Sequence, residues 1–440
     1  MSVASFVDDF RQNPPSGPTW LAPVRRTAID RFAAAGFPTP RTDEDWHFTS
    51  VAPISESEWT PLFHAGGQVH PDDLAPFKFG ASSGNWFEMV FVNGRFTPEL
   101  SHLRGLPAGV RVAQLGDAAD KDDALVRRYL TTLAPTDIAF TALNTAFMTE
   151  GALIHIPADV VVEHPIHLLY VTDAEGARGV TFPRTLIVAG RHARATIVES
   201  YVGVGDAVYF TNAVTEVDVA EGAHLAHYRV QRESARSYHV GTTEVRQARD
   251  SRYHSFSFAT GAALSRVNVY DVLGGEGGEA KLDGLYLGDN EQHIDHQTRI
   301  EHAAPHCASR EVYKGVLDDA AHGVFNGKVY VQPEAQKTDG KQTNNNLLLS
   351  DQAHADTKPQ LEIFADDVKC THGATVGRLD EIALFYLKSR GIAAETARTL
   401  LTYAFAADVL ERIDDDTVRS ALEAQVMERF VGTAEAVAAV

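Results

Sequence analysis

The spacing of apolar residues changes twice along the chain. From Trp86, and again from Gly151, short segments rich in Val, Ile, Tyr and His alternate apolar with polar positions, which is typical of β-strands. Helical spacing precedes this region, returns after Gly377, and interrupts it at about residues 122–147. The pattern predicts an N-terminal helical region at residues 1–85, a β core at residues 86–376 and a C-terminal helical domain at residues 377–440.

The predicted helices carry apolar residues three or four positions apart, with recognisable boundaries. Gly36 and Pro38 stop the first helix, Asp380 is a plausible N-cap, and Gly391 suits a left-handed helix end. The apolar stripes comprise Leu21, Val24, Ala28 and Phe32; Ile382, Phe385 and Tyr386; Ala397, Leu401, Ala404, Phe405, Val409 and Ile413; and Val418, Leu422, Val426 and Phe430. We expect three short C-terminal helices to leave part of this surface for a partner.

A repeat runs through the β core. Segments that start with a small or polar turn and continue into alternation begin at residues 222, 250, 278 and 306, which are 28 residues apart. Few helix formers separate the strands, and this excludes a doubly wound α/β fold. The period favours a mainly β protein built as a β-solenoid, although a closed barrel or jelly roll has a similar composition.

Composition and charge narrow the classes of function. The chain has 440 residues and a net charge of −20, which argues against nucleic acid and anionic membrane surfaces as partners. Its first residues lack a signal-peptide core, and no stretch approaches the length of a membrane span. Only Cys307 and Cys370 are present, in keeping with a reducing compartment, so we expect a cytoplasmic protein.

No nucleotide-binding or hydrolase motif is written in the sequence. Residues 323–328 end in lysine but are followed by Val329 rather than the Ser or Thr of a phosphate-binding loop, and no G-x-S-x-G elbow occurs. We therefore expect the chain not to hydrolyse ATP itself.

Two places offer metal ligands. Cys370 and His372 are two positions apart, so on a strand they share a face, but two ligands leave a tetrahedral site half empty. The alternative is a buried cysteine next to a histidine bonded to a turn. The second place holds His293, His296, His302 and His306, with Asp295 and Glu301 between them, at spacings that match no standard zinc motif.

Five segments together resemble the SufB/SufD family, and one of them, residues 367–375, favours its SufD branch. They match in order and spacing, and they lie at residues 311–317, 323–328, 335–339, 346–351 and 365–379. Residues 36–41 and 46–49 resemble the N-terminal motif of the same family. The resemblance implies a right-handed parallel β-helix core, within which we expect residues 344–346 to form a stacked asparagine turn.

The resemblance also implies a role and partners. It implies a non-enzymatic scaffold that pairs with SufB and the ATPase SufC to build iron–sulfur clusters, with His372 and Cys370 holding transient iron or cluster at the SufB interface. It places the ATPase contact on Phe385, Tyr386, Leu401 and Phe405. Because a solenoid end exposes strand edges, we expect the isolated chain to dimerise through Leu361, Ile363 and Val368. Flavin binding stays open, and the alternative function is a β-helical or barrel enzyme acting on carbohydrate or using a histidine-bound metal.

Overall fold

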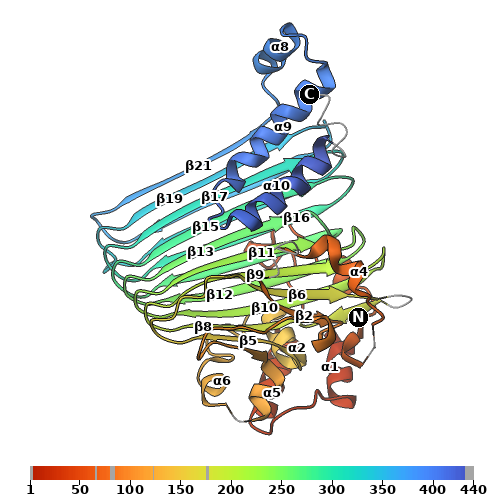
Figure 1. Cartoon of the computed structure of the whole chain (residues 1–440), viewed down its shortest axis with the longest axis vertical. Helices are drawn as coiled ribbons and strands as arrows, with labels where there is room; N and C mark the ends of the chain where they lie inside the picture. The colour runs from red at the N-terminus through yellow and green to blue at the C-terminus, as the bar shows by residue number, and fades with distance from the viewer. Residues whose placement is uncertain (1–2, 65–66, 80–84, 122, 175–177, 432–440) are drawn as a thin grey trace.

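The computed structural model describes residues 3–64, 67–79, 85–121, 123–174 and 178–431. Residues 1–2, 65–66 and 80–84 of the predicted N-terminal helical region and residues 432–440 of the predicted C-terminal domain lie outside these ranges. A long stack of strands occupies the centre, with helices at both ends (Figure 1). The α-helices are α1 Val3–Gln12, α2 Leu21–Ala35, α3 Ala52–Ser55, α4 Pro71–Leu74, α5 Leu115–Asp120, α6 Ala124–Tyr129, α7 Ala139–Phe147, α8 Glu381–Ser389, α9 Ala394–Leu410 and α10 Asp416–Val431.

Successive strands of the core alternate between two sheets. In order from the C-terminal end, the first sheet contains β20 His354–Ile363, β18 His322–Val331, β16 His293–His302, β14 Leu264–Leu273, β12 Tyr238–Gln247, β10 Tyr209–Val219, β8 Arg184–Ala189, β5 Gly151–Ile156 and β4 Arg111–Gln114, with β7 Gly179–Thr181 and β1 Thr60–Pro61 beside it. The second contains β21 Lys369–Gly377, β19 Asp339–Leu348, β17 Ala308–Leu317, β15 Glu279–Gly288, β13 Arg252–Ala259, β11 His224–Arg232, β9 Arg194–Gly203, β6 Ile166–Thr172, β2 Phe87–Val92 and β3 Arg95–Phe96. Long-range pairing within each sheet is parallel from β5 to β21, so the core is a parallel β-solenoid.

The predicted repeat corresponds to one coil of this solenoid. His224 pairs with Arg252, and Arg252 pairs in turn with Glu279, so segments one period apart stack in the same sheet. At the corner before these strands, Gly222, Asp250 and Gly277 adopt positive φ angles of 65°, 52° and 74°. The backbone N–H of each corner residue donates to a carbonyl of the next coil, as Asp250 does to Glu276 at 2.9 Å. Short polar side chains and glycine tolerate this left-handed conformation, which explains the turn signal in the sequence.

The space between the two sheets is filled by alternate side chains from each strand. Apolar and aromatic residues dominate, and Phe91, Tyr170 and Tyr201 stack on successive coils with ring centroids 4.9 and 5.1 Å apart. The asparagines expected to form a turn lie instead inside strand β19. Asn344 points inward and donates to the Tyr313 carbonyl and the Tyr286 hydroxyl, so the expectation of an asparagine turn is wrong.

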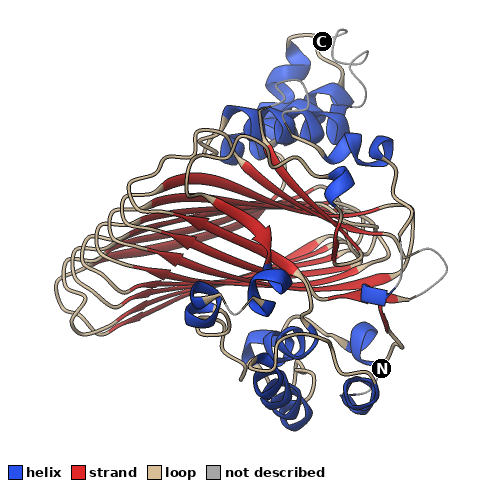
Figure 2. Cartoon of the chain, turned by 60° about the horizontal axis from the view of Figure 1, so that its bottom comes forward, coloured by secondary structure: helices blue, strands red, loops and turns tan. Residues whose placement is uncertain are grey.

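The N-terminal helices cover the outer face of the first sheet (Figure 2). Helix α2 ends where Gly36 takes a φ of 73°, as its apolar spacing and glycine indicate. Helix α1, which the sequence analysis did not assign, buries Phe6 against Phe32 and Phe147. These aromatic contacts attach both helices and α7 to strands β7 and β10.

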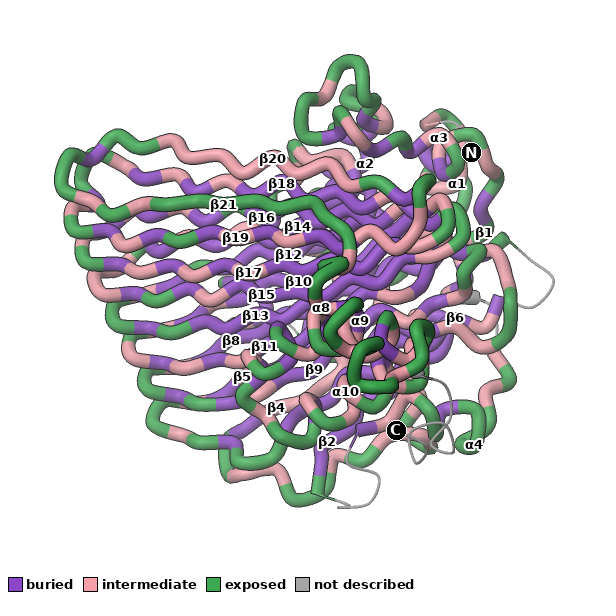
Figure 3. The backbone as a smooth tube through the Cα atoms, turned by 90° about the horizontal axis from the view of Figure 1, so that it is seen from above, coloured by how far each residue is buried: buried purple, intermediate pink, exposed green. Residues whose placement is uncertain are grey.

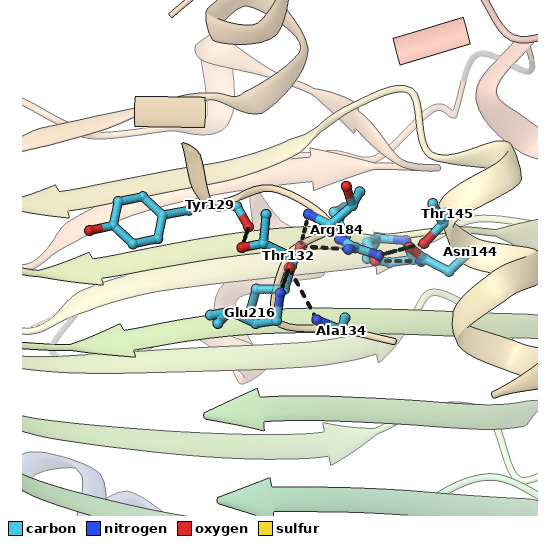
Figure 4. Close-up of polar contacts among 10 residues, drawn as sticks. Tyr129, Thr132, Ala134, Asn144, Thr145, Arg184 and Glu216 are labelled. Atoms are coloured by element: carbon cyan, nitrogen blue, oxygen red, sulfur yellow. Dashed lines mark hydrogen bonds and ion pairs between the residues drawn. The ribbon is translucent and has the colours of Figure 1, made fainter. Parts of the chain in front are cut away.

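A buried ion pair fastens the segment before α7 to the sheet. Glu216 accepts a hydrogen bond from Arg184 at 2.5 Å, and neither side chain is exposed (Figure 4). Glu216 also accepts backbone hydrogen bonds from Thr131, Leu133 and Ala134, while Arg184 donates to Asn144 of α7. The Glu216 carboxylate thus accepts hydrogen bonds from three loop N–H groups that would otherwise be left without a partner.

Two of the three C-terminal helices lie against the second sheet. Helices α9 and α10 bury Val409, Leu410 and Leu422 against an outer face that includes Tyr228 and Phe256. Most of their apolar stripe is therefore used against the solenoid rather than within a separate bundle. Within the described residues, no helix is both long and apolar enough to cross a membrane.

Candidate functional site

The C-terminal end of the solenoid is open. Strands β20 and β21 are the last members of their sheets, and each has a hydrogen-bonded neighbour on one side only among the described residues. Seen from this end, β21 is an exposed strand lying over the buried coils (Figure 3). All nine residues of β21 except Cys370 are exposed. Backbone N–H and C=O groups along such an edge are free to pair with another chain.

Cys370 lies on the inward face of β21, half-buried at the end of the core. It pairs in register with Gly340 and packs with Val329 and Leu361. Gly340 lies between Cys370 and Ser309 on the two neighbouring strands. A Cβ atom added to Gly340 would lie 3.4 Å from both Cys370 Sγ and Ser309 Oγ. The thiol therefore continues an inward column. Burial raises the pKa of Cys370, so the thiol is protonated near neutral pH and a metal must displace its proton.

His372 follows two positions later on the same face and is exposed. In the strand register His372 is paired with Gln342, and Gln342 is paired with Glu311, so the three residues form one column. Within this column, Gln342 Nε2 donates a hydrogen bond to Glu311 Oε2 at 2.6 Å. The oxygen Oε1 of Gln342 is buried and has no hydrogen-bond partner among the described residues. Among the described residues, the exposed imidazole of His372 thus lies next in register to a buried amide oxygen that lacks a hydrogen-bond partner.

Exposed apolar side chains gather around this end. The exposed large apolar residues of the described chain are Val161, Ile363, Phe364, Val376, Ile382, Phe385 and Tyr386. All but Val161 lie between residues 363 and 386: two at the end of β20 or directly after it, one near the end of β21 and three on α8. Clustered exposed apolar groups mark a contact surface more often than scattered ones do.

The residues expected at the ATPase contact fall into two groups. Phe385 and Tyr386 on α8 are 71% and 56% exposed, and α8 projects away from the strands (Figure 1). Leu401 and Phe405 on α9 are half-buried. Phe405 packs against the solenoid, and the Lys314 ammonium lies 4.6 Å from its ring centroid. Of these four residues, only the two on α8 are exposed.

The residues expected at the dimer interface are at the open end. Ile363, at the end of β20, is 38% exposed, whereas Leu361 and Val368 are half-buried and pack with Cys370. Leu361 and Val368 share one apolar cluster with the Cys370 thiol, so a chain that covers this cluster also covers the thiol.

The histidines between residues 293 and 306 do not converge. His296 and His302 lie inside the solenoid, where they bond Ser257 and Ser309, and burial lowers the pKa of each to about 4. His306 is a corner residue with a φ of 60°. His293 lies on the outer face, with its ring centroid 4.6 Å from that of His322 on the next coil. The sequence cluster is therefore not one metal site.

The fold and its open end define a class of protein. It is a parallel β-solenoid whose last coil carries a half-buried thiol, an exposed imidazole and, within the described ranges, two strand edges without a hydrogen-bonded neighbour. Two family models match this chain: the SufBD core domain of the SUF system for FeS cluster assembly at residues 170–405, and the SufBD protein N-terminal region at residues 15–168. The chain belongs to the SufB/SufD family of iron–sulfur cluster assembly proteins.

Known relatives match nearly the whole chain. The iron–sulfur cluster assembly protein SufD of Escherichia coli is 32% identical over 94% of this chain and 95% of its own length. SufD of Bacillus subtilis is 30% identical over 94% of both chains, and a SufBD family protein of Synechocystis is 36% identical over 89% of this chain and 87% of its own. This membership supports a role in iron–sulfur cluster assembly.

Proposed function

We propose that the chain is a non-catalytic scaffold subunit that acquires iron and forms clusters at an interface shared with a SufB paralogue. The observation that carries this proposal is the open last coil, where His372 and Cys370 point the same way beside unpaired strand edges. Two ligands do not complete a four-coordinate site. A facing strand from the paralogue would supply the missing ligands and pair the edge.

An incomplete ligand set suits assembly better than storage. A closed site within one subunit would hold its iron, whereas a site split between subunits opens when they move apart. Because burial raises the pKa of the Cys370 thiol, metal binding at this thiol would release its proton. Family membership favours this role over the alternative of an enzyme acting on carbohydrate.

The exposed face of α8 is the proposed contact for the SufC ATPase. Phe385 and Tyr386 provide aromatic anchors of the kind that dominate binding energy at interfaces. Leu401 and Phe405 would support α8 from α9. Removing all residues after Gly377 is a poor test, because it would also uncover the apolar outer face around Tyr228. Point changes on α8 leave that face covered.

Co-expression of this chain with tagged SufB and SufC from the same organism, followed by co-purification, tests the proposal. The parental chain should recover both partners, and Phe385→Ser with Tyr386→Ser should recover SufB but at least about tenfold less SufC, since losing hot-spot aromatic residues costs about 2 kcal/mol or more. Val161→Ser removes an exposed apolar residue far from α8 and is the matched control. Failure of the parental chain to recover SufB would contradict the scaffold role. Undiminished recovery of SufC by the double variant would contradict the contact on α8.

A further inference from the structure

A column of histidines runs along the outer face of the first sheet, away from His372. His293, His322 and His354 come from β16, β18 and β20 and are direct partners in the strand register. Neighbouring strands lie about 4.8 Å apart, so in-register side chains on one face are adjacent. The rings of His322 and His354 stack with centroids 3.9 Å apart.

A carboxylate joins the last two histidines. Asp356 is two positions after His354 on β20 and therefore lies on the same face. His322 Nε2 is 2.8 Å from Asp356 Oδ2. One ligand atom from each of His322, His354 and Asp356 can be chosen so that all three lie within 4.8 Å of one another.

We propose that His322, His354 and Asp356 bind a divalent first-row transition metal ion, such as zinc or iron(II). Two imidazoles and one carboxylate are a common ligand set for these ions, and three protein ligands leave positions open for water or a partner's group. Ligands about 2.0–2.2 Å from one ion cannot be more than about 4.4 Å apart. The three ligand atoms lie near that separation, and the exposed His354 ring, which is stacked on His322, would rotate out of the stack so that both ring nitrogens face the ion.

The surroundings support a cation at this position. The His354 side chain has no hydrogen bond or ion pair among the described residues, so coordination costs it no existing polar contact. His293 is held in place by the Thr49 hydroxyl at 2.8 Å and meets His322 edge-on, with an 88° angle between the rings. Lys358, the nearest cation along the same face of β20, is paired with Glu44 at 2.6 Å. The negative net charge of the chain also favours cation uptake.

This site is separate from the proposed cluster interface. Its ligands lie on the outer face of the first sheet, whereas His372 and Cys370 lie on the inward face of the second. The proposal therefore does not depend on a shared cluster site, and either can fail alone.

Cobalt(II) titration of the full metal-free chain tests the site, with visible absorption as the readout and zinc(II) as competitor. We expect one equivalent to bind, zinc to displace it, and His354→Ala to weaken binding by at least about 100-fold, since even outer-shell changes cost about 10–100-fold. Asp356→Asn should weaken it by at least about tenfold. Circular dichroism checks that each variant is folded.

His164→Ala is the matched control, because it removes an exposed histidine between β5 and β6, near the other end of the solenoid. It should leave cobalt binding unchanged. The proposal is overturned if the parental chain shows no saturable cobalt or zinc binding at micromolar protein, if His354→Ala binds as tightly as the parent, or if His164→Ala abolishes binding.

Discussion

The two ends of the solenoid are finished in opposite ways. At the N-terminal end, β3 and β4 pair antiparallel with β2 and β5, and helices α1, α2 and α7 cover the neighbouring face. At the C-terminal end, β20 and β21 each keep one free edge within the described part of the chain, and six exposed large apolar side chains lie between the end of β20 and α8. Natural sheets normally protect their edges against unwanted pairing. We propose that the closed end serves stability and that the open end serves association.

The largest effect should come from breaking the closed end. Glu216→Ala leaves the buried Arg184 charge and three loop N–H groups without their partner, so we expect a loss of about 3–5 kcal/mol in the free energy of unfolding. Urea denaturation measures it. Glu279→Ala is the control, because its pair with Arg252 is about half exposed and should be worth less than about 1 kcal/mol. Equal losses in the two variants would contradict the account of this end.

The open end should respond in association rather than in stability. We predict that the isolated chain dimerises, and that Ile363→Asp with Val376→Asp weakens self-association by at least about 30-fold, because charges would then lie where apolar groups meet. Sedimentation velocity at micromolar concentration measures the change. Val161→Asp, at an exposed apolar position outside this end, should remain dimeric. A parental chain that sediments as a monomer would disprove the dimer.

The closed core between the ends should carry a smaller, pH-dependent effect. Burial lowers the pKa of His302 to about 4, against 6.5 for an unperturbed histidine. Between these values the unfolded chain takes up a proton that the native chain does not, so stability falls as the pH falls from 6.5 towards 4. His302→Gln should reduce this slope by up to about 1.4 kcal/mol per pH unit.

Urea denaturation at pH 7.5, 6 and 5 compares the slopes. At pH 7.5 the ring is neutral in both states, so this pH isolates the cost of the substitution itself. Identical slopes for the parent and His302→Gln would show that the buried His302 ring does not cause the loss of stability at low pH.

Local signals in the sequence were enough to predict the coil but not what packs against it. The corner residues Gly222 and Asp250 determine turns within a few positions, so their recurrence predicts the stacking. The apolar stripe of α9 predicts burial without indicating a partner, and the structure buries it on the solenoid. Asn344 resembles a turn residue until the inward Tyr286 hydroxyl is known as its partner.

The candidate sites differ in the same way. Cys370 and His372 are two residues apart, so the alternation of a strand alone places them on one face. His322 and His354 are brought together only by the exact register between coils, and a slip of one residue would turn one of them inward. The sequence signal for this column is the recurrence of histidine about one coil length apart, at His293, His322 and His354.

We propose above that His372, at the open end, is a ligand of a cluster site shared with SufB. The most direct measurement is the iron and acid-labile sulfide content of the complex assembled with SufB and SufC, purified without oxygen. His372→Ala should assemble fully but carry several-fold less iron and sulfide than the parent, and Thr371→Ala, on the opposite face of β21, should match the parent. Cys370→Ser shows whether the thiol is also a ligand or only packs. Parental cluster content in the His372→Ala complex would contradict the account.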